Sequence, residues 1–120
     1  MKYELKKPCE GCPFRKNAAK GWLGSYTAEE IIEHALREIP FFCHIDVERQ
    51  HGYEESDWEE WAFENGQMCA GYLVMMRKMA KLPRDPEFAE AVRNIDAKQE
   101  ILFPPQVFID YHSSNNTSKR

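Results

Sequence analysis

The chain has 120 residues, of which 42% are hydrophobic and 30% charged, and its formal net charge is −4. This length and composition predict one small globular domain, and the acidic balance argues against broad affinity for nucleic acid. No stretch approaches the ~20 apolar residues that cross a membrane, and residues 1–5 do not begin an apolar signal segment. We therefore expect no membrane association and a protein of the cytoplasm, where thiols stay reduced.

Charged residues are unevenly distributed along the chain. Residues 46–64 carry eight carboxylates against Arg49 alone. Residues 1–20 instead carry Glu4 and Glu10 against six cations, which are Lys2, Lys6, Lys7, Arg15, Lys16 and Lys20. This basic amino-terminal arm keeps a nucleic-acid partner open as an alternative, although the net charge disfavours it.

The first predicted element is a loop that holds Cys9 and Cys12 in the sequence C-E-G-C-P. A C-x-x-C turn brings two sulfurs to one side of a short loop, and Gly11 between them is expected to relieve backbone strain. A capping box over residues 27–30 then predicts a helix through residue 39, where Pro40 ends the apolar pattern. Residues 41–45 follow as a short apolar segment, extended or a single turn, that carries Cys43 inward.

A second capping box, over residues 56–59, predicts a short helix that ends at residues 65–66, with Trp58 and Trp61 in the core. The next helix is expected over residues 69–81. Cys69 would then lie in its first turn, where unpaired backbone N–H groups stabilise a thiolate.

Asp85 and Pro86 predict the N-cap and first residue of a helix through residue 92, and residues 104–109 predict a final short helix. Residues 113–120, rich in Ser, Asn and Thr, are expected to form a disordered tail after a metal-binding domain of residues 1–112. The predicted class is therefore mainly α, a small single domain of short helices and loops organised around a four-cysteine metal site.

Cys9, Cys12, Cys43 and Cys69 are the only cysteines of the chain. Thiolates suit zinc and iron–sulfur clusters, and one metal would tie three distant stretches together. Cys43 and Cys69 arrive singly, so the second C-x-x-C of a usual zinc site is missing, whereas a cubane cluster accepts lone cysteines. A proline after a ligand, as at Pro13, also recurs in ferredoxin-like sites. We therefore predict a [4Fe–4S] cluster, with structural zinc as the alternative.

Other interpretations of the cysteines stay open. His44 could replace one cysteine as a zinc ligand, the thiols could be buried apolar residues, or Cys9 and Cys12 could form a redox disulfide. Our prediction is that His44 supports the site without ligating it, that Arg15 and Lys16 balance its negative charge, and that Trp22 covers it. Solvated surface cations, and an apolar loop anchor in the case of Trp22, are the plainer interpretations.

Several short motifs occur together: residues 7–16 with the cysteine pair, G-W-L-G at residues 21–24, F-C-H at 42–44, C-A-G at 69–71, and residues 81–86. This combination resembles a family of small proteins encoded by bacteriophages and bacteria, known only as a domain of unknown function. The resemblance covers nearly the whole chain except the tail. It implies a phage or prophage setting, hence the host cytoplasm, and four cysteines that act together, but it implies no activity.

The sequence leaves three functional interpretations open. The first, which size and charge favour, is a small phage-type iron–sulfur or zinc protein that contacts an unidentified phage or host protein. The second is an enzyme with His44 as acid–base group, which is disfavoured because no catalytic constellation stands out and four thiolates leave the metal no open position. The third is a redox-sensing regulator whose basic arm meets nucleic acid.

Overall fold

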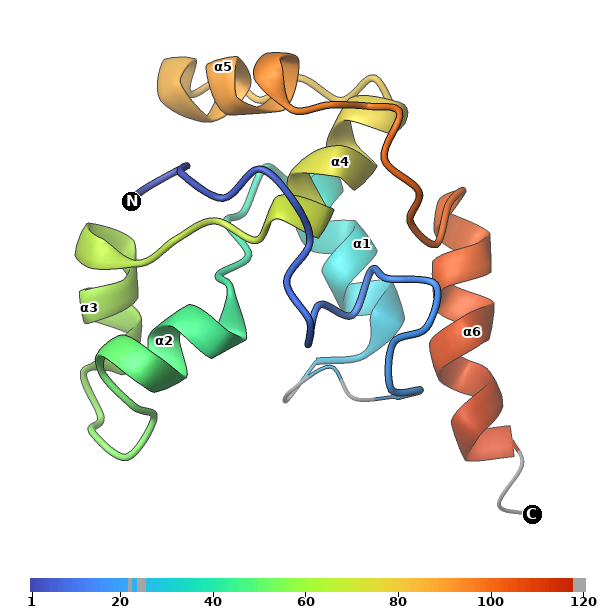
Figure 1. Cartoon of the computed structure of the whole chain (residues 1–120), viewed down its shortest axis with the longest axis horizontal. Coiled ribbons are helices and arrows are strands. Elements are labelled where there is room, and N and C mark those ends of the chain that lie inside the picture. The colour runs from blue at the N-terminus through green and yellow to red at the C-terminus, as the bar shows by residue number, and fades with distance from the viewer. Residues whose placement is uncertain (22, 24–25, 118–120) are drawn as a thin grey trace.

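Helix α4 (Ala70–Lys78) lies at the centre of the molecule, with α5 (Pro86–Asn94) across one end, α6 (Pro105–Thr117) on one side and α2 (His44–Gln50) and α3 (Trp58–Asn65) on the other (Figure 1). Helix α1 (Ala28–Leu36) packs against α6, and α4 packs against α5. This computed structural model describes residues 1–21, 23 and 26–117, with side chains through residue 113. The predicted class, one small and mainly helical domain, is confirmed.

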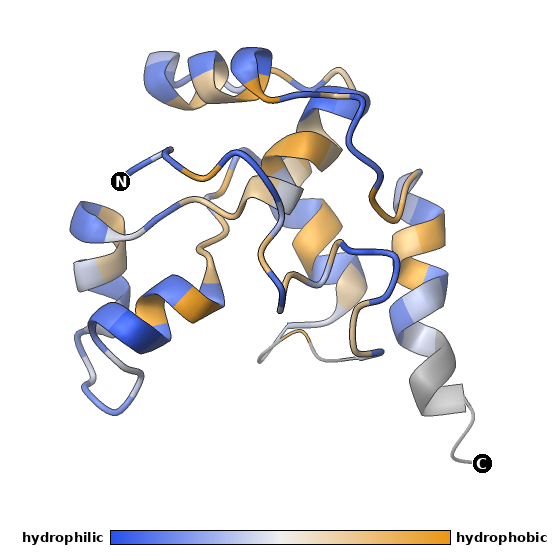
Figure 2. Cartoon of the chain, viewed as in Figure 1, coloured by the Kyte–Doolittle hydropathy of each residue, from blue (hydrophilic) through white to orange (hydrophobic). Residues whose placement is uncertain are grey.

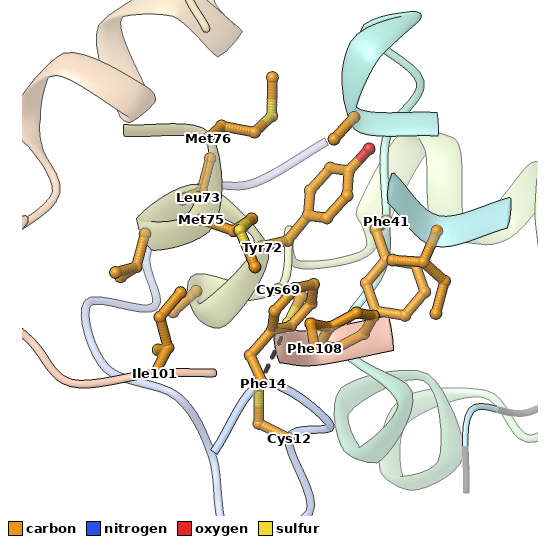
Figure 3. Packing of buried hydrophobic residues seen from close by; sticks show 14 of the residues in the cluster. Cys12, Phe14, Phe41, Cys69, Tyr72, Leu73, Met75, Met76, Ile101 and Phe108 are labelled. Atoms are coloured by element: carbon orange, nitrogen blue, oxygen red, sulfur yellow. Dashed lines mark hydrogen bonds between the residues drawn. The ribbon is translucent and has the colours of Figure 1, made fainter. Parts of the chain in front are cut away.

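The core is built around α4, because every residue from Ala70 to Met76 is buried. Figure 2 shows the resulting concentration of hydrophobic residues along this helix. Phe14 stacks on Phe108 with ring centroids 4.5 Å apart, and Tyr72 contacts both Phe14 and Phe41 (Figure 3). Burial of each such side chain contributes about 1.5–3 kcal/mol, so this aromatic cluster makes a large contribution to stability.

Helix α1 begins as predicted but ends earlier. The Thr27 hydroxyl accepts from the Glu30 N–H, and the Glu30 carboxylate accepts from the Thr27 N–H, which confirms the capping box. The helix stops at Leu36 rather than at residue 39, because Glu38 has a φ of 65°, in the left-handed region that ends a right-handed helix. The chain turn frees the Ile39 carbonyl to accept from the buried Tyr72 hydroxyl at 2.6 Å.

The region between the third and fourth cysteines differs most from the sequence prediction. A helix, α2, follows Cys43 where a single turn or extended segment is predicted. The second capping box is wrong: Asp57 is the N-cap of α3 and forms no side-chain cap hydrogen bond. Trp58 and Trp61 are only half-buried and pack on Tyr53 and His51, so they seal the α2–α3 unit and not the main core.

The remaining helices follow the predicted starts. The Asp85 carboxylate accepts from the Phe88 N–H at 2.9 Å and caps α5, as expected. Helix α6 continues beyond His112 to Thr117, into the stretch for which the sequence predicts a tail, and residues 118–120 lie outside the described part of the chain. Among the described residues, none of the helices is long and apolar enough to cross a membrane.

His112 fastens α6 to the loop that follows the first two cysteines. Its Nδ1 accepts from the Gly21 N–H at 3.0 Å, so its Nε2 must carry the proton that is donated to the Pro13 carbonyl at 2.8 Å. The ring is 2% exposed and packs on Phe108. Burial lowers the pKa of His112, because a second proton would face the Gly21 donor inside the protein.

We predict that the free energy of unfolding falls as the pH drops below about 6.5, the ordinary pKa of histidine. The pKa of His112 is lower in the folded chain than in the unfolded chain, so its contribution to stability is complete above this pH and is lost as the pH falls. Urea unfolding at a series of pH values measures the effect.

The control is His112→Gln, whose amide can form the same two hydrogen bonds without titrating. This variant should lose most of the pH dependence and keep the part due to His44, whose pKa is also lowered by burial. His112→Ala should lose about 1–3 kcal/mol, because the Pro13 carbonyl is left unpaired. A wild-type stability that does not change between neutral and mildly acidic pH would contradict the prediction.

Candidate metal centre

Backbone hydrogen bonds shape the turn that holds Cys9 and Cys12 and join the segments that hold Cys43 and Cys69. The amino-terminal pair lies on consecutive turns, in which the Cys12 N–H donates to the Cys9 carbonyl at 3.1 Å. The other two cysteines flank an antiparallel bridge between Phe42 and Met68. There the Cys43 N–H donates to the Gln67 carbonyl and the Cys69 N–H to the Phe41 carbonyl, each at 2.8 Å. This bridge sets Cys43 at the N-cap of α2 and Cys69 at the N-cap of α4.

The four thiols meet as two crossed pairs. The Sγ atoms of Cys12 and Cys69 are 3.6 Å apart, and those of Cys9 and Cys43 are 3.9 Å apart. All four thiols are free, and all four line one small cavity of about 10 Å³ together with Gly11, Pro13, Phe41, Phe42, His44 and Ile45. Figure 3 shows the Cys12–Cys69 contact at the edge of the aromatic core. Sequence neighbours Cys9 and Cys12 thus each face a cysteine from elsewhere in the chain.

Among the described residues, no group of three or more His, Cys, Asp or Glu side chains stands in the arrangement of a metal site. The structure therefore brings the four predicted ligands to one cavity but leaves the metal itself, and the kind of metal, as predictions.

The hydrogen bond within each pair shifts the pKa values of its two thiols in opposite directions. The Cys43 thiol donates to Cys9, which lowers the pKa of Cys9 to about 7 and raises that of Cys43. The hydrogen bond between Cys12 and Cys69 lowers the pKa of Cys12 and raises that of Cys69. Within each pair the thiolate form is therefore favoured at one sulfur and disfavoured at the other, an arrangement that is suited to capture of a soft cation.

Backbone amides face these sulfurs from the turns and from both helix starts. The N–H groups of Phe14 and Gly71 lower the pKa of Cys12, and that of Gly11 lowers the pKa of Cys9. Amides of the first turns of α2 and α4 act in the same direction on Cys43 and Cys69, although neither thiol forms a cap hydrogen bond. The site therefore supplies positive dipoles to sulfur without a charged side chain in the cavity wall.

His44 lines the cavity, and its supporting role stays a prediction. Its half-buried ring packs on Phe41, with centroids 5.3 Å apart, and its carbonyl accepts from the Tyr53 hydroxyl at 3.4 Å. Burial lowers the pKa of His44, which keeps the ring neutral.

The other three residues that the sequence predicts to support the site are Arg15, Lys16 and Trp22. Arg15 donates to the Cys9 carbonyl at 3.5 Å, so its charge lies near the turn without contacting sulfur. Lys16 forms an exposed ion pair with Glu100 at 3.7 Å and does not line the cavity. Trp22, expected to cover the site, lies outside the described residues.

Sequence reasoning missed Gly71, which lets α4 approach the cysteine turn. A Cβ atom added to this glycine would lie 2.5 Å from the Cys12 Sγ and 2.8 Å from the Phe14 Cβ. A glycine within a predicted helix, two residues after a cysteine, is a signal of such close approach. Gly11, in contrast, has no left-handed backbone, so relief of strain does not explain it.

Comparisons of the chain with protein-family models, curated proteins and solved structures gave no match. The resemblance to a phage and bacterial family therefore stays a prediction.

Gly71→Ala is predicted to destabilise the chain by about 1–3 kcal/mol or more and to separate Cys12 from Cys69, because the added methyl group overlaps both Cys12 and Phe14. Chemical denaturation measures the first effect and thiol labelling with an iodoacetamide probe the second. Gly11→Ala is the matched control, since its Cβ would meet only the flexible end of Ile45, at 3.0 Å. Equal stability of the two variants would contradict the prediction.

Oxidation of the metal-free chain is predicted to join Cys12 to Cys69 and Cys9 to Cys43. Hydrogen peroxide supplies the oxidant: two thiols lose two protons and two electrons, an S–S bond forms, and the O–O bond breaks to give two waters. The pairing follows from the separations of 3.6 and 3.9 Å. Cleavage after Glu10, which stands between Cys9 and Cys12, followed by mass spectrometry under non-reducing conditions, identifies the linked peptides.

The matched variant Cys69→Ser should leave Cys12 as a free thiol and still form the Cys9–Cys43 bond. A main product that links Cys9 to Cys12 would show that the sequence neighbours, and not the crossed pairs, control the chemistry.

Proposed function

We propose that this chain is a small metal-binding protein in which Cys9, Cys12, Cys43 and Cys69 together hold one metal centre. The observation that carries the proposal is the convergence of all four free thiols, from three separate segments, on a single small cavity. Buried cysteines that only fill space have no reason to meet in this way.

The sulfur separations favour a single tetrahedral ion. Zinc binds thiolate at about 2.3 Å, so two of its sulfur ligands lie about 3.8 Å apart. The separations of 3.6 and 3.9 Å within the two pairs are close to this value, and a cavity of about 10 Å³ has room for one small ion. Structural zinc is therefore the centre that the geometry supports best, with the two pairs drawn together across the cavity.

A [4Fe–4S] cluster is the second candidate, and the sequence spacing supports it. Two of the ligands are single cysteines far apart in the chain, and Pro13 follows Cys12. Backbone amides aimed at the sulfurs would also serve an iron–sulfur centre, whose potential depends on such hydrogen bonds. Because a cubane holds its thiolates at separate corners, binding would require the sulfurs of each pair to move apart.

The role that follows for the metal is structural. Zinc bound to four thiolates supplies cross-linking and has no open position for substrate. The residues of this chain orient the sulfurs through the Phe42–Met68 bridge, exclude water by the aromatic cluster, and keep His44 neutral beside the site. We propose that a surface away from the metal centre contacts the phage or host partner, and that the protein acts in the cytoplasm.

The deciding experiment is anaerobic purification followed by elemental analysis and an optical spectrum. We expect about one zinc per chain and a colourless protein that keeps its helicity in air, because zinc undergoes no redox change. About four irons per chain, with broad absorption near ~400 nm that fades in air together with helicity, would instead establish the cluster. A folded chain that takes up neither metal after reconstitution would overturn the proposal.

Replacement of any one of the four cysteines by serine is predicted to lower the metal content well below that of the wild-type chain and to increase proteolysis. Metal binding supplies about 10 kcal/mol or more of folding free energy to such sites, which a small core does not replace. His44→Ala is the control and should keep the metal. If His44→Ala loses metal while one cysteine variant retains it, the site has three cysteines and one histidine as ligands.

A further inference from the structure

A second concave site lies beside the cysteine turn, and none of its lining residues lines the cysteine cavity. It is an open hollow of about 470 Å³ lined by Lys7, Pro8, Arg15, Lys16, Asn17, Gln99 and Glu100. We call this set of residues the basic hollow. Its charged lining consists of three cations and one carboxylate, in a chain whose net charge is −4.

The walls of the basic hollow are held in place by hydrogen bonds. The Gln99 side-chain amide donates to the Lys6 carbonyl at 2.9 Å and ties the loop before α6 to the amino-terminal segment. The Arg15 Nε donates to Asn17 at 3.3 Å while its Nη1 donates to the Cys9 carbonyl, so the guanidinium is positioned before any ligand arrives. Less conformational entropy is therefore lost on binding.

The cations of the basic hollow remain available to an anion. The Lys16–Glu100 ion pair, at 3.7 Å, joins side chains that are 59% and 80% exposed. Such surface pairs contribute about 0–1 kcal/mol, so a phosphate group can replace the Glu100 carboxylate at little cost.

The charge of the rest of the molecule restricts where a polyanion can bind. The eight carboxylates of residues 46–64 belong to α2, α3 and their connection, on the side of the molecule away from α6 (Figure 1). The basic hollow lies between the amino-terminal loop and the segment that leads to α6. A polyanion is therefore repelled by one side and attracted by the other, which fixes the orientation of binding.

We propose that the basic hollow binds the sugar–phosphate backbone of a nucleic-acid strand through Lys7, Arg15 and Lys16. Three cations that come from two separate stretches and line an open hollow suit successive phosphates along a strand better than one enclosed phosphate group. Contacts to phosphates carry no sequence information, so we expect the binding to be independent of base sequence. The proposal does not depend on the metal.

The test is fluorescence anisotropy of a labelled 20-nucleotide single-stranded DNA with the full chain, titrated at several salt concentrations. With three cations in contact, the slope of log K against log salt should be about −2, since each phosphate contact on a single strand contributes about −0.7. Lys7→Ala/Lys16→Ala should weaken binding and bring the slope to about −0.7. Glu100→Gln should tighten binding, because it removes the one carboxylate of the hollow.

The matched control is Arg84→Ala/Arg93→Ala, which removes the same number of charges from residues outside the hollow. It should bind like the wild type. Equal weakening by both double variants would mean that only net charge matters, and absence of wild-type binding at low salt would also overturn the proposal. ATP, added at the same phosphate concentration as the DNA, should not displace the DNA. Displacement would overturn the proposal, since the hollow would then be a site for small phosphate compounds. Metal content and thermal unfolding of each variant separate these outcomes from a failure of the metal centre.

Discussion

The close approach of α4 to the amino-terminal cysteine turn is the constraint on which the rest of this structure depends. It requires a residue without a side chain at Gly71, because any Cβ there would overlap Cys12 and Phe14. The approach brings Cys69 within 3.6 Å of Cys12 and, through the same turn, delivers Phe14 to the aromatic core. The cysteine site and the hydrophobic core are therefore parts of one packing arrangement.

That shared packing explains why a site of four thiols can exist in a chain this small. Soft sulfur atoms tolerate an apolar wall, and backbone N–H groups from the turns and helix starts supply the polar contacts that the wall lacks. His112 holds the opposite side of the loop, so the turn is fixed both by α4 and by α6. A metal would add a cross-link to an arrangement that the fold already prepares.

The molecule also separates its charges. The basic hollow lies between the amino-terminal loop and the segment that leads to α6, whereas the acidic residues belong to α2, α3 and their connection, on the side of the molecule away from α6 (Figure 1). With a net charge of −4, only such a separation lets an acidic protein present a local surface that attracts anions. A buried cysteine site and an exposed charged site can then serve different purposes in one small domain.

The sequence by itself determined the helical class, the starts of α1 and α5, and the four cysteines as one candidate site. These depend on local chemistry: capping side chains, the 3.6-residue period and the ligand preference of thiolates. Only the tertiary structure decided which cysteines pair, since the Phe42–Met68 bridge joins residues that no local rule connects. It also decided the roles of Gly71 and His112. The close contact at a glycine and the hydrogen-bond partners of a histidine ring depend on which distant segments pack against them.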